Sequence, residues 1–273
     1  MMDWSLREEW QSADIRVPYA ALLAARQIAY PTLDVDHYLQ AISDLVRLAA
    51  ERVGGRYPIL VQAEQLSDFL FTDLGFAGNS NDYDDPRNSF LNDVLERRCG
   101  LPITLSIIYV EVARQLGLPA YGIGLPGHFI VGIRDGDESH WRDPFHGGRR
   151  LSLNDCVEII EATTGYEGPL DAAWFSPISP RDTLTRLANN LRTNYVYRKD
   201  WTHAASAIQV LQMMQPEASE HLRDLGLIYL RQQSIPQAAY FLNEYLTQSP
   251  NASDAAMIRQ GTKQLFEDWA ALN

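Results

Sequence analysis

The sequence predicts an α+β fold: a helical N-terminal subdomain, then a helix packed on an antiparallel sheet, and finally an all-α segment of repeated helical hairpins. Three observations support this prediction. Residues 1–98 have mainly helical patterning, and residues 99–182 place one apolar helix before a run of short strands. The remaining residues, 183–273, repeat with a period of 34 residues.

The N-terminal subdomain contains one clearly bounded helix. Acidic residues begin it at Asp34, and Gly54-Gly55 follow its last turn. Residues 75–88 are rich in Gly, Asn and Asp, which predicts a long ordered loop or a lid, and Asn88 or Ser89 is expected to cap the next helix. The predicted helices cover residues 19–29, 34–53, 59–70 and the stretch from this cap to Arg97.

A single buried helix is predicted to begin at Gly100-Leu101-Pro102, because proline is tolerated in the first turn of a helix. Its side chains are mostly apolar, so we expect it to lie in the core until Gly117-Leu118-Pro119 ends it. The turn Asp135-Gly136-Asp137 is typical of a hairpin. Three strands of an antiparallel meander are predicted at Ala120–Gly124, His128–Ile133 and His140–Phe145.

The C-terminal third repeats itself. Pro216 recurs as Pro250, and this spacing of 34 residues is the length of a tetratricopeptide repeat. Small Ala204 and Ala238 would let paired helices pack closely. The residues in register are Leu191/Leu225, Tyr195/Tyr229, Ala204/Ala238, Ile208/Leu242 and Leu211/Tyr245. The predicted units are two repeats at about residues 185–218 and 219–252, and a capping helix over Asp254–Leu272.

The distribution of charge argues against nucleic-acid binding. The formal net charge of the chain is −12. Residues 183–273 contain eight Lys/Arg and eight Asp/Glu, so the acidic excess lies entirely in residues 1–182. Phosphate recognition needs a basic surface, and neither part of the sequence offers one.

The sequence also predicts a cytoplasmic protein that does not enter a membrane. No apolar run approaches the roughly 20 residues needed to cross a bilayer. The segment MMDWSLREEWQSADIR contains acids and lacks the apolar stretch of a secretory signal. Cys99 and Cys156 form no disulfide framework and are too few thiols for a zinc–cysteine site.

One region of the sequence resembles a known family. The region is RRCGLPITLSIIYVEVARQLGLPAYGIGLPGHFIVGI…WRDPFHGG, residues 97–148, with the preceding segment NDYDDPRNSFLNDVLERR. It resembles the SirB-type family, whose members join a transglutaminase-like (papain-like) core to tetratricopeptide repeats. The resemblance spans most of the chain and implies a transglutaminase-like domain over residues 1–182, followed by repeats over 183–273.

The wider transglutaminase-like superfamily uses a Cys-His-Asp triad, and the resemblance implies two of its members. A cysteine at the start of the buried helix is the nucleophile, a strand histidine is its base, and an aspartate on the next strand orients the imidazole. His128 and Asp143 match the base and the orienting residue, so we expect their side chains to be hydrogen-bonded. The nucleophile position falls near Pro102 or Ile103, neither of which can attack a substrate.

Two residues near the missing nucleophile are alternatives to it. Cys99 follows Arg97-Arg98, whose charges favour a thiolate, although a small residue in a turn is the simpler interpretation. Ser106 lies one turn inside the helix, where it is interpreted as a core or groove serine. Cys156 has the pattern of a small buried hydrophobic residue.

No metal and no cofactor is predicted. The loop Asp82-Tyr83-Asp84-Asp85 offers oxygen atoms to calcium but lacks the spacing of a known calcium loop, so it is interpreted as solvated. His140 and His146 flank Asp143, which alone is a weak basis for a metal site. The pair of His128 and Asp143 stays open to three interpretations: a structural pair, a ligand-binding site or a working catalytic pair.

Two functions follow from these observations. The favoured one is a non-catalytic interaction or regulatory protein whose repeats bind a protein or peptide partner in a concave groove. The alternative is a divergent cysteine-dependent acyl-transfer enzyme or protease that uses Cys99, His128 and Asp143. A Cys99 thiol out of hydrogen-bonding reach of His128 would favour the first.

Overall fold

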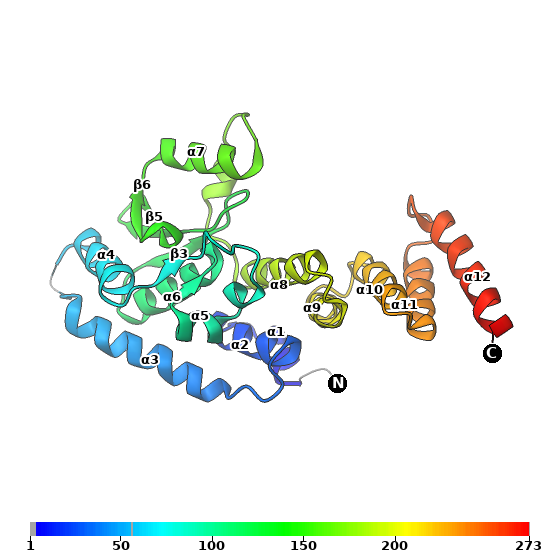
Figure 1. Ribbon diagram of the computed structural model, residues 1–273. Coiled ribbons are helices and arrows are strands. Elements are labelled where there is room, and N and C mark those ends of the chain that lie inside the picture. Colours follow the sequence, from blue (N-terminus) through cyan, green and yellow to red (C-terminus); the bar gives the residue numbers. More distant parts are fainter. Residues whose placement is uncertain (1–3, 56, 273) are drawn as a thin grey trace. The chain divides into compact units, whose positions relative to one another are not determined.

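The computed structural model describes residues 4–55 and 57–272 (Figure 1). The chain forms two compact units. The first contains the chain up to Arg26 together with Thr32–Leu187, and the second contains Gln27–Pro31 and the chain from Ala188 onward.

Helices make up the N-terminal part of the first unit, as predicted. Asp34 begins one of them by accepting a hydrogen bond from the His37 backbone N–H, and Val53 follows its last turn, which confirms the helix predicted over residues 34–53. The elements are α1 (Trp4–Gln11), α2 (Val17–Ile28), α3 (Val35–Arg52), α4 (Ile59–Ser67), the π-helical turn η1 (Asp68–Asp73), the 3-10 turn η2 (Pro86–Ser89) and α5 (Leu91–Arg97).

The predicted cap of α5 is wrong. Phe90 precedes α5, and Asn88 and Ser89 belong to η2. Asn88 is used in the preceding loop instead, because its Nδ2 donates to the carbonyls of Asp82 and Tyr83, at 2.7 and 3.3 Å. These bonds order the loop that the composition of residues 75–88 predicts.

The same loop carries a short strand and a buried acid. β1 (Ala77–Gly78) pairs in parallel with β2 (Cys99–Gly100). Asp85 is buried and bonded to Arg87 and Arg97 at 2.8 and 3.3 Å. The prediction of a solvated acidic loop is therefore wrong for Asp85, because two guanidinium groups replace water around its carboxylate.

The central helix α6 (Pro102–Gln115) begins at the predicted proline and is buried along most of its length. It packs against a four-stranded antiparallel sheet of order β3-β4-β5-β6. The strands are β3 (Ala120–Ile123), β4 (Ile130–Asp135), β5 (Glu138–Asp143) and β6 (Arg149–Leu151). The α+β class is confirmed, and β6 is an additional strand that the sequence did not predict.

Two further elements complete the first unit. α7 (Leu153–Thr164) follows β6, and the 3-10 turn η4 (Ala172–Phe175) comes after it. Cys156 on α7 is fully buried with Ile123 and Ile130 of the sheet, which confirms the prediction of a buried hydrophobic residue.

The second unit is built of helical hairpins (Figure 1). Its elements are α8 (Pro180–Tyr197, which begins in the first unit), α9 (Trp201–Met214), α10 (Glu220–Arg231), α11 (Ile235–Gln248) and α12 (Ala255–Leu272). The described chain from residue 183 to 272 contains no strand, as predicted.

The 34-residue period recurs in the backbone. α11 begins and ends 34 residues after α9, and both hairpin turns contain a residue with positive φ at the same offset, Lys199 and Gln233, each at 59°. Gly226 allows α10 and α11 to approach, because a Cβ there would lie 2.5 Å from Leu242 Cγ. No helix in the described residues is both long and apolar enough to span a bilayer.

Candidate functional site

Asp143 is the last residue of β5 and lies opposite Arg149 of β6. Its Oδ1 accepts hydrogen bonds from the backbone N–H groups of Phe145 and His146, at 3.0 and 3.3 Å, so it caps the 3-10 turn η3 (Pro144–His146). Gly147-Gly148, with φ of 72° and 71°, then reverse the chain into β6. The fully buried carboxylate is thus fixed by its own backbone turn.

His128 lies in the turn between β3 and β4, two residues before β4 begins. The expectation that it opens the strand is therefore wrong, since Gly127 (φ 68°) and the bond from His128 N–H to the Leu125 carbonyl form a turn there. Arg186 Nη2 donates to the carbonyls of both Leu125 and His128, at 2.6 Å each. These contacts hold the His128 backbone in place.

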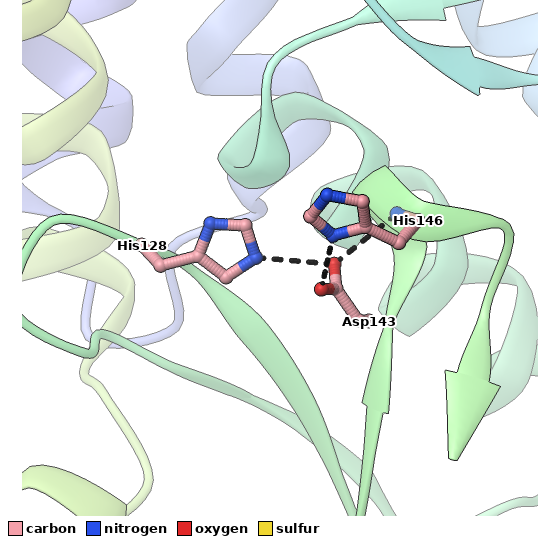
Figure 2. A group of neighbouring side chains, drawn as sticks. All are labelled: His128, Asp143 and His146. Carbon is pink, nitrogen blue, oxygen red and sulfur yellow. Dashed lines mark hydrogen bonds and ion pairs between the residues drawn. The ribbon is translucent and has the colours of Figure 1, made fainter. Parts of the chain in front are cut away.

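The predicted hydrogen bond between His128 and Asp143 is confirmed. His128 Nε2 lies 3.1 Å from Asp143 Oδ1. On the other carboxylate oxygen, His146 Nδ1 lies 2.6 Å from Asp143 Oδ2. Figure 2 shows both imidazole rings directed at the one carboxylate, which therefore has two histidine partners.

The electrostatics of the site keep Asp143 charged. Burial would raise the pKa of its carboxyl, but hydrogen bonds and charge interactions from His128 and His146 outweigh burial and lower the pKa. Both ion-pair partners of this carboxylate are histidines. His128 is buried, whereas 49% of the His146 side chain is exposed.

Cys99 does not join this pair. It lies in β2 opposite Ala77, is half-buried, and precedes the first residue of α6 by three positions. No hydrogen bond joins its thiol to His128. The Cys99 sulfur also does not belong to the group formed by His128, Asp143 and His146, whose ligating atoms lie within 4.8 Å of one another. The structure thus brings together two of the three predicted site residues.

The first residues of α6 are buried, and the hydroxyl group among them is hydrogen-bonded. Pro102 and Ile103 are buried there, and the buried Thr104 Oγ1 donates to the Asn88 carbonyl at 2.8 Å and accepts from the Leu101 N–H at 3.0 Å. Thr104 is therefore used as a helix cap.

Ser106 lies four residues after Pro102, one turn further along α6. Its buried hydroxyl has no hydrogen-bond partner. The residue is part of the lining of a cleft of about 450 Å³, together with Arg16, Val110 and Phe129. This agrees with the prediction of a core or groove serine.

His146 is the site residue that sequence reasoning missed. The sequence places His140 and His146 on either side of Asp143, but the imidazole of His140 lies near Glu138 and Arg150, at 3.5 and 3.3 Å. The signal was the spacing Asp-Pro-Phe-His, because an aspartate that caps a short helical turn brings a histidine three residues later back over its own carboxylate.

A helix on an antiparallel sheet, with a histidine from the turn before one strand and an aspartate from the end of the next, defines a transglutaminase-like domain. The hairpins with a 34-residue period define tetratricopeptide repeats. Comparison with known families agrees. The model of the transglutaminase-like superfamily matches residues 36–189, and that of the tetratricopeptide repeat matches residues 191–261.

Relatives cover most of the chain. A UPF0162 protein of Xylella fastidiosa (strain 9a5c) is 37% identical over 88% of this chain and 86% of its own length. UPF0162 protein PA3419 of Pseudomonas aeruginosa is 30% identical over 91% of this chain and 92% of its own length. F-box only protein 21 of Homo sapiens is 27% identical over 58% of this chain and 28% of its own length. The chain belongs to the transglutaminase-like superfamily and, within it, to the SirB-type family.

Proposed function

We propose that this chain is a non-catalytic interaction or regulatory protein of the cytoplasm. In this proposal a transglutaminase-like domain without its cysteine nucleophile is joined to repeats that bind a protein or peptide partner. The observation that supports the proposal is the start of α6, where buried Pro102 and Ile103 stand at the expected nucleophile position and the Thr104 hydroxyl is bonded to the Asn88 carbonyl. Domains of these two kinds together suggest a role in protein interaction.

The repeats supply the binding surface in this proposal. α10 buries Leu222 and Leu225 inside its hairpin, whereas Leu227 on the same helix is 45% exposed. An exposed leucine on the first helix of a repeat is suited to contact an apolar side chain of an extended or helical peptide. Since residues 183–273 contain eight Lys/Arg and eight Asp/Glu, we expect apolar contacts and hydrogen bonds, not a strong charge pattern, to select the partner.

The test uses the full chain as bait in a lysate of its source organism, with two matched variants. Leu227→Glu places a charge on α10, and Tyr240→Glu places one on α11 of the same hairpin, where the side chain is 61% exposed. We expect a partner captured by the wild type to be lost from Leu227→Glu and kept by Tyr240→Glu. Equal capture by both variants, or none by the wild type above the bare resin, would contradict the proposal.

The alternative function, a cysteine-dependent acyl-transferase or protease, requires a particular geometry at Cys99. Proton transfer from Cys99 requires its sulfur close to a His128 nitrogen, at about 3 to 3.5 Å. No such hydrogen bond is present, so no contact of Cys99 favours this alternative.

A further inference from the structure

We propose that His128, Asp143 and His146 bind a divalent transition-metal ion, with Zn²⁺ as the ion that fits best. One ligating atom from each residue lies within 4.8 Å of the other two. The residues come from three backbone segments, the turn before β4, the end of β5 and η3, and their side chains converge (Figure 2). Among the described residues, no other group of three His, Cys, Asp or Glu side chains meets this distance.

The distances suit a metal with nitrogen and oxygen ligands. Zn²⁺ binds imidazole nitrogen and carboxylate oxygen at about 2.0 to 2.2 Å, which puts two tetrahedral ligands about 3.3 Å apart. The two nitrogen–oxygen distances here are 3.1 and 2.6 Å. The first distance is to Oδ1 and the second is to Oδ2, and one ligating atom of each residue lies within 4.8 Å of the other two. Side-chain shifts of up to about 1.5 Å would therefore bring three ligating atoms around one ion.

Metal binding displaces protons from the imidazole nitrogens, and these protons are accounted for without a further reactant. In the metal-free site, the imidazole nitrogens that face Asp143 donate to its oxygens. When a metal binds these nitrogens, a neutral ring moves its proton to its other nitrogen, and an imidazolium releases one proton to solvent.

The burial of Asp143 favours a cation beside it. The carboxylate is 0% exposed, and both of its ion-pair partners are histidines. A buried carboxylate is stable when it is paired or coordinates a metal. Backbone N–H groups of Phe145 and His146 already hold Oδ1, which orients the carboxylate and leaves Oδ2 to ligate.

The chain contains a matched pair that lacks the third ligand. Asp200 caps α9 and binds His203 three residues later, with Nδ1 and Oδ2 2.7 Å apart. The corresponding distance between His146 and Asp143 is 2.6 Å. This capping geometry therefore does not need a metal, and the addition of His128 is what distinguishes the proposed site.

The ligand types select the class of ion. Imidazole nitrogen suits zinc and its neighbours in the first transition row, whereas Mg²⁺ and Ca²⁺ prefer all-oxygen sites. Three protein ligands leave one tetrahedral position for water. The half-exposed His146 gives the ion a path from solvent. This inference is independent of partner binding by the repeats.

The test titrates Zn²⁺ alone into the chelator-treated full chain, in competition with a chromophoric chelator. A Cys99→Ser background removes the half-buried thiol as a ligand. We expect one Zn²⁺ per chain and no competition from Mg²⁺. His146→Ala should weaken binding by at least about 10- to 100-fold, the loss that removal of an outer-shell partner already causes. His203→Ala and His140→Ala are the matched controls and should bind as the wild type does.

His128→Gln is a second variant, checked for folding by circular dichroism, and should lose the same site. Two results would overturn the proposal. One is zinc uptake by the wild type no greater than that of the His128→Gln/His146→Ala double variant. The other is a loss of binding in His203→Ala or His140→Ala equal to that in His146→Ala, which would indicate adventitious binding to exposed histidines.

Discussion

His128 and Asp143 are joined across the sheet by a hydrogen bond of 3.1 Å between Nε2 and Oδ1, although 15 residues separate them in the chain. The register of β4 and β5, in which Val131 lies opposite Arg142, brings the turn before β4 next to the end of β5. The pair is therefore a product of the pairing of β4 with β5.

The buried charge of Asp143 should contribute strongly to stability. We expect Asp143→Asn to lower the free energy of unfolding by about 1.5 to 3 kcal/mol, because hydrogen bonds to a charged group are lost or weakened. The control is Asp200→Asn, which changes the more exposed cap of α9; asparagine caps about as well as aspartate, so its effect should be below about 1 kcal/mol. Urea unfolding measures both, and equal losses would contradict the assigned role of the buried carboxylate.

Gly78 is required for the contact between the 75–88 loop and η3. A Cβ on this residue would lie 2.5 Å from both the carbonyl oxygen and the Cδ2 of Phe145. We expect Gly78→Ala to destabilise the chain by about 1 to 3 kcal/mol, because the backbone must shift to relieve the overlap. Gly55→Ala, with no atom within 4 Å of its new Cβ, should be nearly neutral in the same thermal unfolding experiment. Similar losses in both variants would show that this close packing is absent.

Asp85 should make the free energy of unfolding depend on pH in the acidic range. Burial would raise the pKa of its carboxyl, but hydrogen bonds and charge interactions from Arg87, with the charge of Arg97, lower it below the ordinary value of 3.8. A lowered pKa in the folded state gives stability that is present above the unfolded pKa and is lost as the pH falls through the folded pKa. The difference in unfolding free energy between wild type and Asp85→Asn should therefore be constant from about pH 7 to 5 and shrink below about pH 4.

An Arg87→Gln background gives the control for this acid dependence. Arg87 makes the largest contributions that lower the pKa of Asp85. In this background the difference in unfolding free energy between the chains with Asp85 and with Asp85→Asn should therefore depend less on pH. A difference that grows as the pH falls would have the wrong sign for this interpretation.

Much of the fold could be predicted because its signals are local. The helix over residues 34–53 is marked at both ends by its own residues, and the 34-residue period fixes the repeats through buried positions such as Ala204 and Ala238. The start of the buried helix could also be predicted, because proline is tolerated in the first turn of a helix and α6 begins at Pro102.

The parts that could not be predicted depend on partners distant in the sequence. β6 is three residues long and begins with Arg149-Arg150, so it has no apolar alternation, and only its pairing with β5 makes it a strand. His146 joins the site through the turn after Asp143, where a local cap and the distant His128 meet on one carboxylate. Sequence spacing alone does not show which of several histidines will face an aspartate.

The proposed absence of cysteine-dependent catalysis is tested most directly by the alkylation rate of Cys99. Iodoacetamide is added to the folded chain from about pH 5 to 9, a range that spans the roughly 8.5 pKa of a free cysteine. Cys156 should not interfere, because burial raises the pKa of its thiol to about 12. We expect Cys99 to react at the same rate in the wild type and in His128→Ala at every pH in this range. Rapid, selective alkylation of Cys99 at pH 5 to 6 that disappears in His128→Ala would contradict the account and support an enzyme.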